Sequence, residues 1–143
     1  MLDPFGNAAD RFRHPVTGPT DDMHPGWPES TPIVQLPSSS VFPSGARMRL
    51  RPLLRSDGHE WRRQRIDDES FLRPVEPTQT APWEAAHSQQ AWWNHLMYLR
   101  TAAREALVVP LVIEVEGKFA GQVTLGNIQH GSIRDCWIGY WVY

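Results

Sequence analysis

Histidine and cysteine are the side chains here that most directly suggest metal binding or nucleophilic chemistry. The chain has six histidines and one cysteine. His87 and His95 stand eight residues apart, a spacing that fits no compact zinc motif. Cys136 precedes Trp137 in a segment with a strand pattern, which favours a small buried side chain over a nucleophile. These residues therefore predict neither a metal site nor a cysteine nucleophile.

Charged side chains give no sign of a polyanionic partner. The basic run Arg62, Arg63 and Arg65 is followed by the acidic run 67–69, a balance typical of a solvated helix face. Over the whole chain 14 Lys plus Arg stand against 16 Asp plus Glu, a formal net charge of −2. We therefore expect no direct contact with nucleic acid.

Composition predicts a single soluble domain in the cytoplasm. Of the 143 residues 41% are hydrophobic and 21% charged, which fits one domain with a modest core. The longest nearly apolar stretch, 106–113, contains Pro110 and is far shorter than the ~20 residues of a membrane-spanning helix. The single cysteine and the absence of a secretion leader favour a reducing compartment. We expect no membrane partner.

The first 45 residues are predicted to form an irregular, proline-rich arm. Eight of the 13 prolines lie in this segment, which shows no sustained helical or alternating period. Trp27 could pack into a groove or stay exposed, and the sequence leaves both alternatives open. The folded domain is expected to cover residues 46–143.

Periodicity predicts one strand and two helices in the first part of that domain. Residues 47–54 alternate between apolar and charged side chains, as in a strand with one wet face. Asp57 and Glu60 match a capping box at the start of the first helix. The second helix is predicted over 88–105, with a core stripe formed by Trp92, Leu96, Leu99 and Ala103.

The remaining residues predict a three-strand antiparallel meander. Apolar alternation over 107–115 reaches a Glu-Gly turn signal, and the returning strand is expected over 119–128. A further strand is predicted over 133–143, which is rich in aromatic residues. An unprotected apolar strand at a sheet edge is an aggregation template, so we expect more chain to follow Tyr143.

Four segments carry a resemblance to a known family. They are 50–53 (Leu-Arg-Pro-Leu), 71–77 (Phe-Leu-Arg-Pro-Val-Glu-Pro), 121–128 (Gly-Gln-Val-Thr-Leu-Gly-Asn-Ile) and 138–142 (Ile-Gly-Tyr-Trp-Val). From about His24 to its end the chain resembles the RimJ-type ribosomal-protein-alanine N-acetyltransferases of the GNAT family. Val75 departs from the pattern, since the family usually has a tryptophan there. The resemblance implies an α/β (α+β) fold with a GNAT-like mixed sheet, of which this chain would be the N-terminal half.

The same resemblance implies a reaction. Acetyl would pass from acetyl-coenzyme A, the co-substrate, to the N-terminal amine of a protein, with a ribosomal protein as the expected partner. In this family a strand like 138–142 leads into a glycine-rich loop that holds the coenzyme pyrophosphate at a helix N-terminus. We expect the chain to stop before that loop and to be inactive alone. The alternatives are a catalytically silent peptide-binding module and an acetyltransferase of small amines.

Site residues follow from the resemblance as well. The pantetheine arm of the coenzyme would lie beside the last strand, which makes the backbones of Trp141, Val142 and Tyr143 candidate cofactor contacts. The loop that contains Glu76 would border the acceptor groove, so this carboxylate is a candidate substrate-binding group. Weaker polar candidates on the sheet are Asn127 and Tyr140. No catalytic residue is identified, and the oligomeric state is left open.

Overall fold

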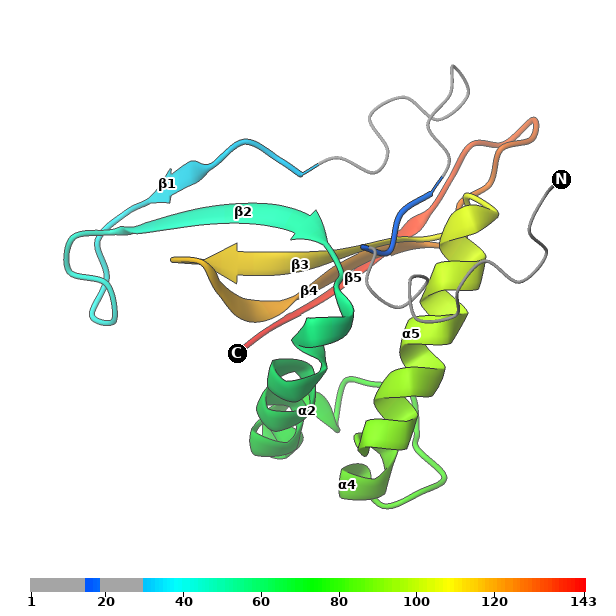
Figure 1. Ribbon diagram of the computed structural model, residues 1–143, viewed down its shortest axis with the longest axis horizontal. Coiled ribbons are helices and arrows are strands. Elements are labelled where there is room, and N and C mark those ends of the chain that lie inside the picture. Colours follow the sequence, from blue (N-terminus) through cyan, green and yellow to red (C-terminus); the bar gives the residue numbers. More distant parts are fainter. Residues whose placement is uncertain (1–14, 19–29) are drawn as a thin grey trace, which may run out of the picture.

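A five-stranded antiparallel sheet forms the centre of the computed structural model, which describes residues 15–18 and 30–143. Sheet order equals chain order, and every strand pairs antiparallel with its neighbour (Figure 1). The strands are β1 (Val34–Leu36), β2 (Ala46–Pro52), β3 (Val109–Val115), β4 (Lys118–Gly126) and β5 (Trp137–Val142). The predicted strand and three-strand meander are therefore confirmed within one sheet, to which β1 is added.

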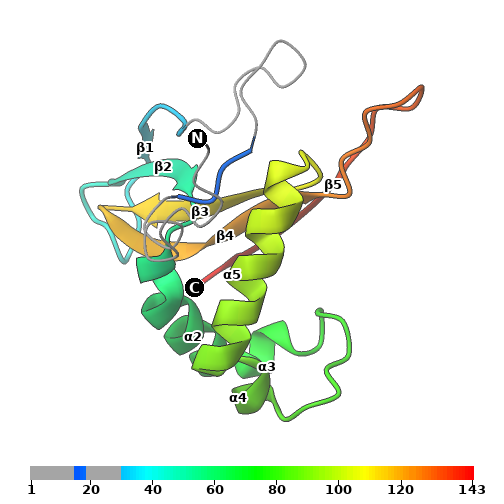
Figure 2. The same ribbon diagram turned by 45° about the vertical axis from the view of Figure 1, so that its right-hand side comes forward.

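The helices lie between β2 and β3 in the chain. They are the short 3-10 helix η1 (Arg55–Asp57) and the α-helices α2 (Gly58–Asp67), α3 (Glu69–Leu72), α4 (Trp83–Ala86) and α5 (Gln89–Arg104). Side chains of α2 and α5 share one core with the sheet, represented by Trp61, Leu96 and Val112. Figure 2 shows α2 and α5 over the sheet, with α3 and α4 at their lower end. The result is an α/β fold with one helix layer against one sheet face.

Helix α5 follows its sequence signals closely. The Ser88 hydroxyl accepts a hydrogen bond from the Ala91 N–H at 3.1 Å, which caps the first turn. The buried side chains of the helix include the whole predicted stripe of Trp92, Leu96, Leu99 and Ala103. The predicted second helix and its core face are confirmed.

The start of α2 differs from the predicted capping box. The Asp57 carboxylate makes no cap hydrogen bond to the helix. It accepts instead from the Leu54 N–H at 2.7 Å and pairs with Arg51 at 2.8 Å. Glu60 binds Arg63 at 2.8 Å rather than reaching back to the cap. The expectation was wrong because the largely buried Arg51 guanidinium requires carboxylates around it, and Glu114 supplies another.

Regular structure begins earlier than predicted. Strand β1 lies within the segment expected to be irregular, and Val34 pairs with Met48 of β2. Val16 is buried, and its N–H donates to the Leu53 carbonyl oxygen at 2.8 Å. A strand of three residues is too short to show a period, but the unpaired backbone groups along β2 are enough to bind it. Trp27 lies outside the described residues.

The two faces of the sheet have different surroundings. Toward the helices, Val112, Phe119 and Gln122 are buried. Along β5 the alternate side chains point to the other face, where Tyr140 is 72% exposed and Val142 is also exposed. The helix layer therefore covers one face, and the opposite face presents apolar side chains at β5.

Replacing Leu96 by Ala tests the packing of the helix layer. Leu96 lies in the core and is 0% exposed, so Leu96→Ala should lower the free energy of unfolding by about 2 to 5 kcal/mol. Trp92 is also buried, and Trp92→Ala should lower it by a similar amount. Tyr98, on the same helix but 68% exposed, provides the control: Tyr98→Ala should stay within about 0.5 kcal/mol. Urea melts measure both. Equal losses at positions 96 and 98 would contradict the assigned face.

Candidate functional site

The three candidate cofactor contacts, at the end of strand β5 (Trp137–Val142), do not all direct their backbone groups to the same side. On one side it pairs with β4, with Trp141 opposite Gln122, and the Tyr143 N–H donates to the Ala120 carbonyl oxygen at 2.9 Å. Along its other side no strand among the described residues is paired. Because antiparallel pairing alternates, Trp141 and Tyr143 direct their backbone groups toward β4, whereas those of Val142 point to the open edge. Val142 is therefore the cofactor candidate whose backbone groups are left unpaired by the strands of the described structure.

Gly121 determines how closely β5 approaches β4. Its φ is +154°, and a Cβ atom at this position would lie 2.2 Å from the Trp141 carbonyl oxygen and 3.0 Å from the Val142 Cα. No side chain fits at those distances. The position of β5 beside β4 therefore depends on this glycine.

Aromatic side chains attach β5 to helix α2. The Trp141 ring lies on the helix side of the sheet, with its centroid 5.8 Å from that of Phe119. The Tyr143 hydroxyl donates to Asp67 at 3.2 Å and accepts from Arg63 at 3.1 Å, and the Arg63 guanidinium lies 4.9 Å from the ring centroid. The side chains of Trp141 and Tyr143 thus fix the end of β5 on the helix side of the sheet. These contacts do not involve the backbone groups at the open edge of β5.

Beneath β5 lies the Arg65 cluster, which we define as Arg65, Glu76, Trp61, Trp83 and Trp141. The Arg65 guanidinium carbon lies 5.2 Å from the ring centroid of Trp61, 5.8 Å from that of Trp83 and 5.3 Å from that of Trp141. Its Nη2 donates to Glu76 Oε2 in a close ion pair. Since Arg65 is only 7% exposed, its expected place on a solvated helix face was wrong. Positions 61 and 65 lie on the same face of a helix, so Arg65 is buried along with Trp61.

The loop that carries Glu76 is attached to α2 at two points. Glu76 pairs with the Arg65 side chain, and Trp83, where the loop ends, donates its indole Nε1–H to the Arg65 carbonyl oxygen at 2.8 Å. Between these points lies the proline-containing segment 77–82. One residue of α2 therefore sets the position of the predicted acceptor loop.

His95 adjoins the cluster from helix α5. Its ring stacks on Trp61 with centroids 5.3 Å apart, and its Nε2 atom is buried without a hydrogen-bond partner in the described structure. Burial, and then the positive charge of Arg65, lower the pKa of His95 to about 4. The imidazole is therefore neutral at pH 7, so it adds no second positive charge next to Arg65.

The other substrate candidates do not converge on Glu76. Asn127 follows β4 with a φ of 49°, and its side chain is exposed. The preceding residue, Gly126, pairs with Trp137. Asn127 therefore lies near the start of β5, whereas Trp141 lies near its end. Tyr140 points to the sheet face opposite the helices. Glu76 and Trp141 thus both contact Arg65, whereas Asn127 and Tyr140 lie elsewhere. The roles of all four residues stay predictions.

Cys136 does not occupy the buried position expected of it. Its side chain is exposed and the residue precedes β5. Among the described residues no group of three or more His, Cys, Asp or Glu side chains could hold a metal ion. No helix in the described part of the chain is long and apolar enough to span a membrane.

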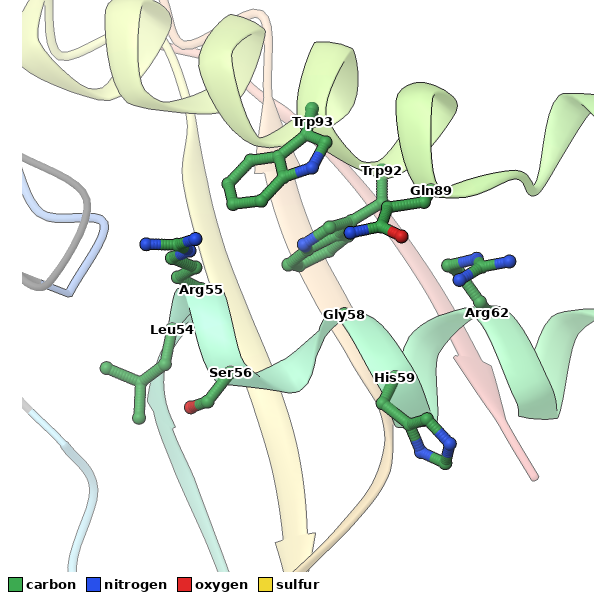
Figure 3. A pocket seen from close by; sticks show the side chains of 9 residues that line it. All are labelled: Leu54, Arg55, Ser56, Gly58, His59, Arg62, Gln89, Trp92 and Trp93. Atoms are coloured by element: carbon green, nitrogen blue, oxygen red, sulfur yellow. The ribbon is translucent and has the colours of Figure 1, made fainter. Parts of the chain in front are cut away.

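A surface groove of about 580 Å³ lies between η1, the start of α2 and the start of α5. Figure 3 shows it in front of the strands; its lining residues are Leu54, Arg55, Ser56, Gly58, His59, Arg62, Gln89, Trp92 and Trp93. The Arg55 guanidinium stacks 4.6 Å from the Trp93 ring centroid, and Arg62 donates to the His87 carbonyl oxygen at 3.1 Å. No predicted site residue lines this groove. Sequence reasoning missed it because helix-to-helix packing, rather than a motif, creates it.

The buried histidine predicts a pH effect on stability. Between pH 6.5 and about 4 the unfolded chain binds a proton at His95 that the folded chain does not, so stability should fall as the pH falls through this range. His95→Asn removes this difference. The slope of the unfolding free energy against pH should then decrease by the amount that corresponds to about one bound proton. Urea melts across the range measure the slope for both proteins. Parallel declines would show that His95 titrates alike in both states.

Adding a methyl group at Gly121 tests the placement of β5. Gly121→Ala forces the backbone around Trp141 to move, and we expect a loss of about 1 to 3 kcal/mol in the free energy of unfolding. At Gly131 a Cβ atom would have no neighbouring atom within 4 Å, so Gly131→Ala serves as the control and should change stability by less than about 0.5 kcal/mol. Thermal and urea melts compare the two variants. A neutral Gly121→Ala would contradict the close approach of β4 and β5.

Comparison with known proteins links this geometry to one group of enzymes. No protein-family model and no curated protein sequence matches the chain. Among solved structures, Mycobacterium smegmatis RimJ in complex with CoA-disulfide matches with a TM-score of 0.72 and 38% sequence identity, over 83% of this chain and 54% of RimJ.

Two further solved structures share the fold at lower identity. The ribosomal-protein-S5-alanine acetyltransferase of Vibrio fischeri matches with a TM-score of 0.57 and 18% identity, over 76% of this chain and 55% of that protein. A RimL ribosomal alpha-N-protein acetyltransferase in complex with coenzyme A matches with a TM-score of 0.55 and 17% identity, again over 76% and 55%. The chain thus spans about half the length of each of these proteins. Its structural neighbours are the RimJ and RimL ribosomal-protein alanine acetyltransferases, and its fold is that of the GNAT acetyltransferases.

Proposed function

We propose that this chain is part of an N-acetyltransferase that transfers acetyl from acetyl-coenzyme A to the N-terminal amine of a protein. The observation that carries the proposal is the 38% identity and TM-score of 0.72 with a RimJ structure that contains a coenzyme A disulfide. The acceptor would be of the ribosomal-protein alanine type, and the reaction would take place in the cytoplasm.

The open edge of β5 offers a means of holding the cofactor. In the proposed complex the amide groups of the pantetheine arm pair with the backbone of Val142, as an added strand pairs with a sheet edge. The side chains of Trp141 and Tyr143 remain bound to α2, through Arg65 and Asp67 respectively. Extended pantetheine can therefore bind without disturbing the core contacts of this strand.

The reaction also requires an amine that has lost its proton. The amine nitrogen attacks the thioester carbonyl carbon, a C–N bond forms, the C–S bond breaks, and coenzyme A leaves as the thiol. A protein N-terminal amine has a pKa of about 8 and is only partly deprotonated at pH 7. Glu76, which is held by Arg65 and partly accessible to solvent, offers a carboxylate to an arriving ammonium group. We assign no catalytic base.

Partial coverage of RimJ limits what the chain should do alone. The nucleotide end of acetyl-coenzyme A carries several negative charges, which in the related family a glycine-rich loop binds at a helix N-terminus. No glycine-rich loop opens a helix among the described residues. We therefore propose that the 143-residue chain binds acetyl-coenzyme A weakly and does not turn it over.

A chimaera tests the proposed function. The chain is joined to the part of Mycobacterium smegmatis RimJ that it does not cover, and both proteins are titrated with acetyl-coenzyme A by calorimetry. Acetyl transfer to a peptide that begins with alanine is followed by mass spectrometry. We expect the chimaera to bind the cofactor and to acetylate the peptide at its N-terminus, and the 143-residue chain to do neither measurably.

The other outcomes separate the alternatives. A folded chimaera that binds the peptide but never acetylates it would favour a catalytically silent peptide-binding module. Acetylation of free small amines in preference to the peptide would favour a small-amine acetyltransferase. Micromolar binding of acetyl-coenzyme A by the 143-residue chain would contradict the expected weak binding and indicate a coenzyme site within the chain.

A further inference from the structure

Arg65 joins three segments that lie far apart in the sequence. Its side chain pairs with Glu76 in the loop after α3, and its carbonyl oxygen accepts from Trp83 at the start of α4. Its guanidinium lies 5.3 Å from the ring centroid of Trp141 on β5. The loop expected to border the acceptor and the strand expected to border the cofactor therefore meet at one cation.

Stability alone is a poor explanation for this cation. Burying a guanidinium is costly, and the Nε atom of Arg65 is buried without a hydrogen-bond partner in the described structure. Glu76 and the three indole rings offset the cost, yet apolar side chains often replace buried ion pairs with no loss of stability. Arg65 does, however, fix the position of a carboxylate, which an apolar side chain cannot do.

Glu76 keeps the capacity to bind a second cation while paired with Arg65. A carboxylate has two oxygens and about four acceptor positions, and Arg65 Nη2 bonds to Oε2. The Glu76 side chain is 20% exposed, against 9% for Arg65, so it is the member of the pair that solvent reaches. An ammonium group arriving from solvent would therefore meet the carboxylate, with the guanidinium behind it.

We infer that Arg65, which also contacts Trp141 of β5, is a positioning residue that holds Glu76 so that its carboxylate binds the protonated N-terminal amine of the acceptor. The inference rests on the proposed function and adds the residue that orients the acceptor. Glu76 binds the ammonium form. The ammonium then gives its proton to water, and the free amine leaves the carboxylate and attacks the thioester. Arg65 acts only through Glu76 and touches neither substrate.

Peptide binding by the 143-residue chain tests this role. The probes are a short peptide that begins with alanine and carries a free N-terminal amine, and the same peptide acetylated at that amine. Binding is followed by the indole N–H signals of the tryptophans in NMR spectra. We expect the free-amine peptide to bind at least about tenfold more tightly, because only its charged amine can form a hydrogen bond with the Glu76 carboxylate. This preference should weaken above a pH of about 8, where the amine loses its charge.

Four variants separate positioning from folding. Arg65→Met removes the cation and retains an apolar side chain of similar length, and Glu76→Gln removes the carboxylate charge. The double variant avoids leaving either charge buried alone, so it keeps the test valid if a single variant unfolds. Arg73→Met is the matched control, because Arg73 binds Glu69 at 2.8 Å on an exposed surface near the same loop.

The expected pattern is loss of the free-amine preference. Arg65→Met, Glu76→Gln and the double variant should each reduce it to about the same level, because residues that act as a unit are not additive. Arg73→Met should retain the full preference. Retention of the preference by folded Arg65→Met or by the folded double variant would overturn the inference.

Equal binding of the two peptides by the unchanged chain would overturn it as well. Acetyl transfer by the chimaera is measured separately. The proposed function is therefore tested by acetyl transfer, and the role of Arg65 by peptide binding.

Discussion

Two arginines held between the helix layer and the sheet, Arg51 and Arg65, tie segments together that lie apart in the sequence. Arg65 requires Glu76 and three indole rings around it, which determines where the loop after α3 and the strand β5 can lie. Arg51 imposes a similar demand at the other end of α2, where it binds Asp57 at 2.8 Å and Glu114 at 2.5 Å. Burial alone would raise the pKa of Glu114, but hydrogen bonds from Arg49 and Arg51 hold it below its usual value. Helix α2 is thus fixed at both ends by electrostatics.

The elements could be predicted from the sequence wherever one face of a long segment is apolar. Helix α5 and strands β3 and β4 each alternate or repeat over many residues, so their type and approximate limits follow from burial. Strand β1 has three residues and shows no period, which is why it was missed. Asp57 was misread because a capping pattern cannot reveal that Arg51, on the preceding strand, binds the same carboxylate.

The candidate site could be predicted only in part, for a related reason. Glu76 was singled out by the resemblance to acetyltransferases, and it binds Arg65, which also contacts Trp141 of β5. Its acceptor-binding role stays a prediction. Tyr140 is next to Trp141 in a strand, so the two side chains must face opposite sides of the sheet, and alternation alone would have separated them. The sequence did carry a signal for the burial of Arg65, because Arg65 follows Trp61 by four residues on one helix. The neighbouring charges 67–69 hid this signal, since they suggested a solvated surface.

The order of the strands has a consequence for how the chain folds. Strands β3, β4 and β5 are neighbours in both sequence and sheet, so this meander can form by closing short loops. Strand β2 pairs with β3 only after the whole helical segment between them has been looped out, which carries a larger entropic cost. The ion pairs of Arg51 link β2, β3 and the start of α2 across that loop. Amide hydrogens in the meander should therefore gain protection before those of β2, and the arginine contacts belong to the late step that closes the sheet.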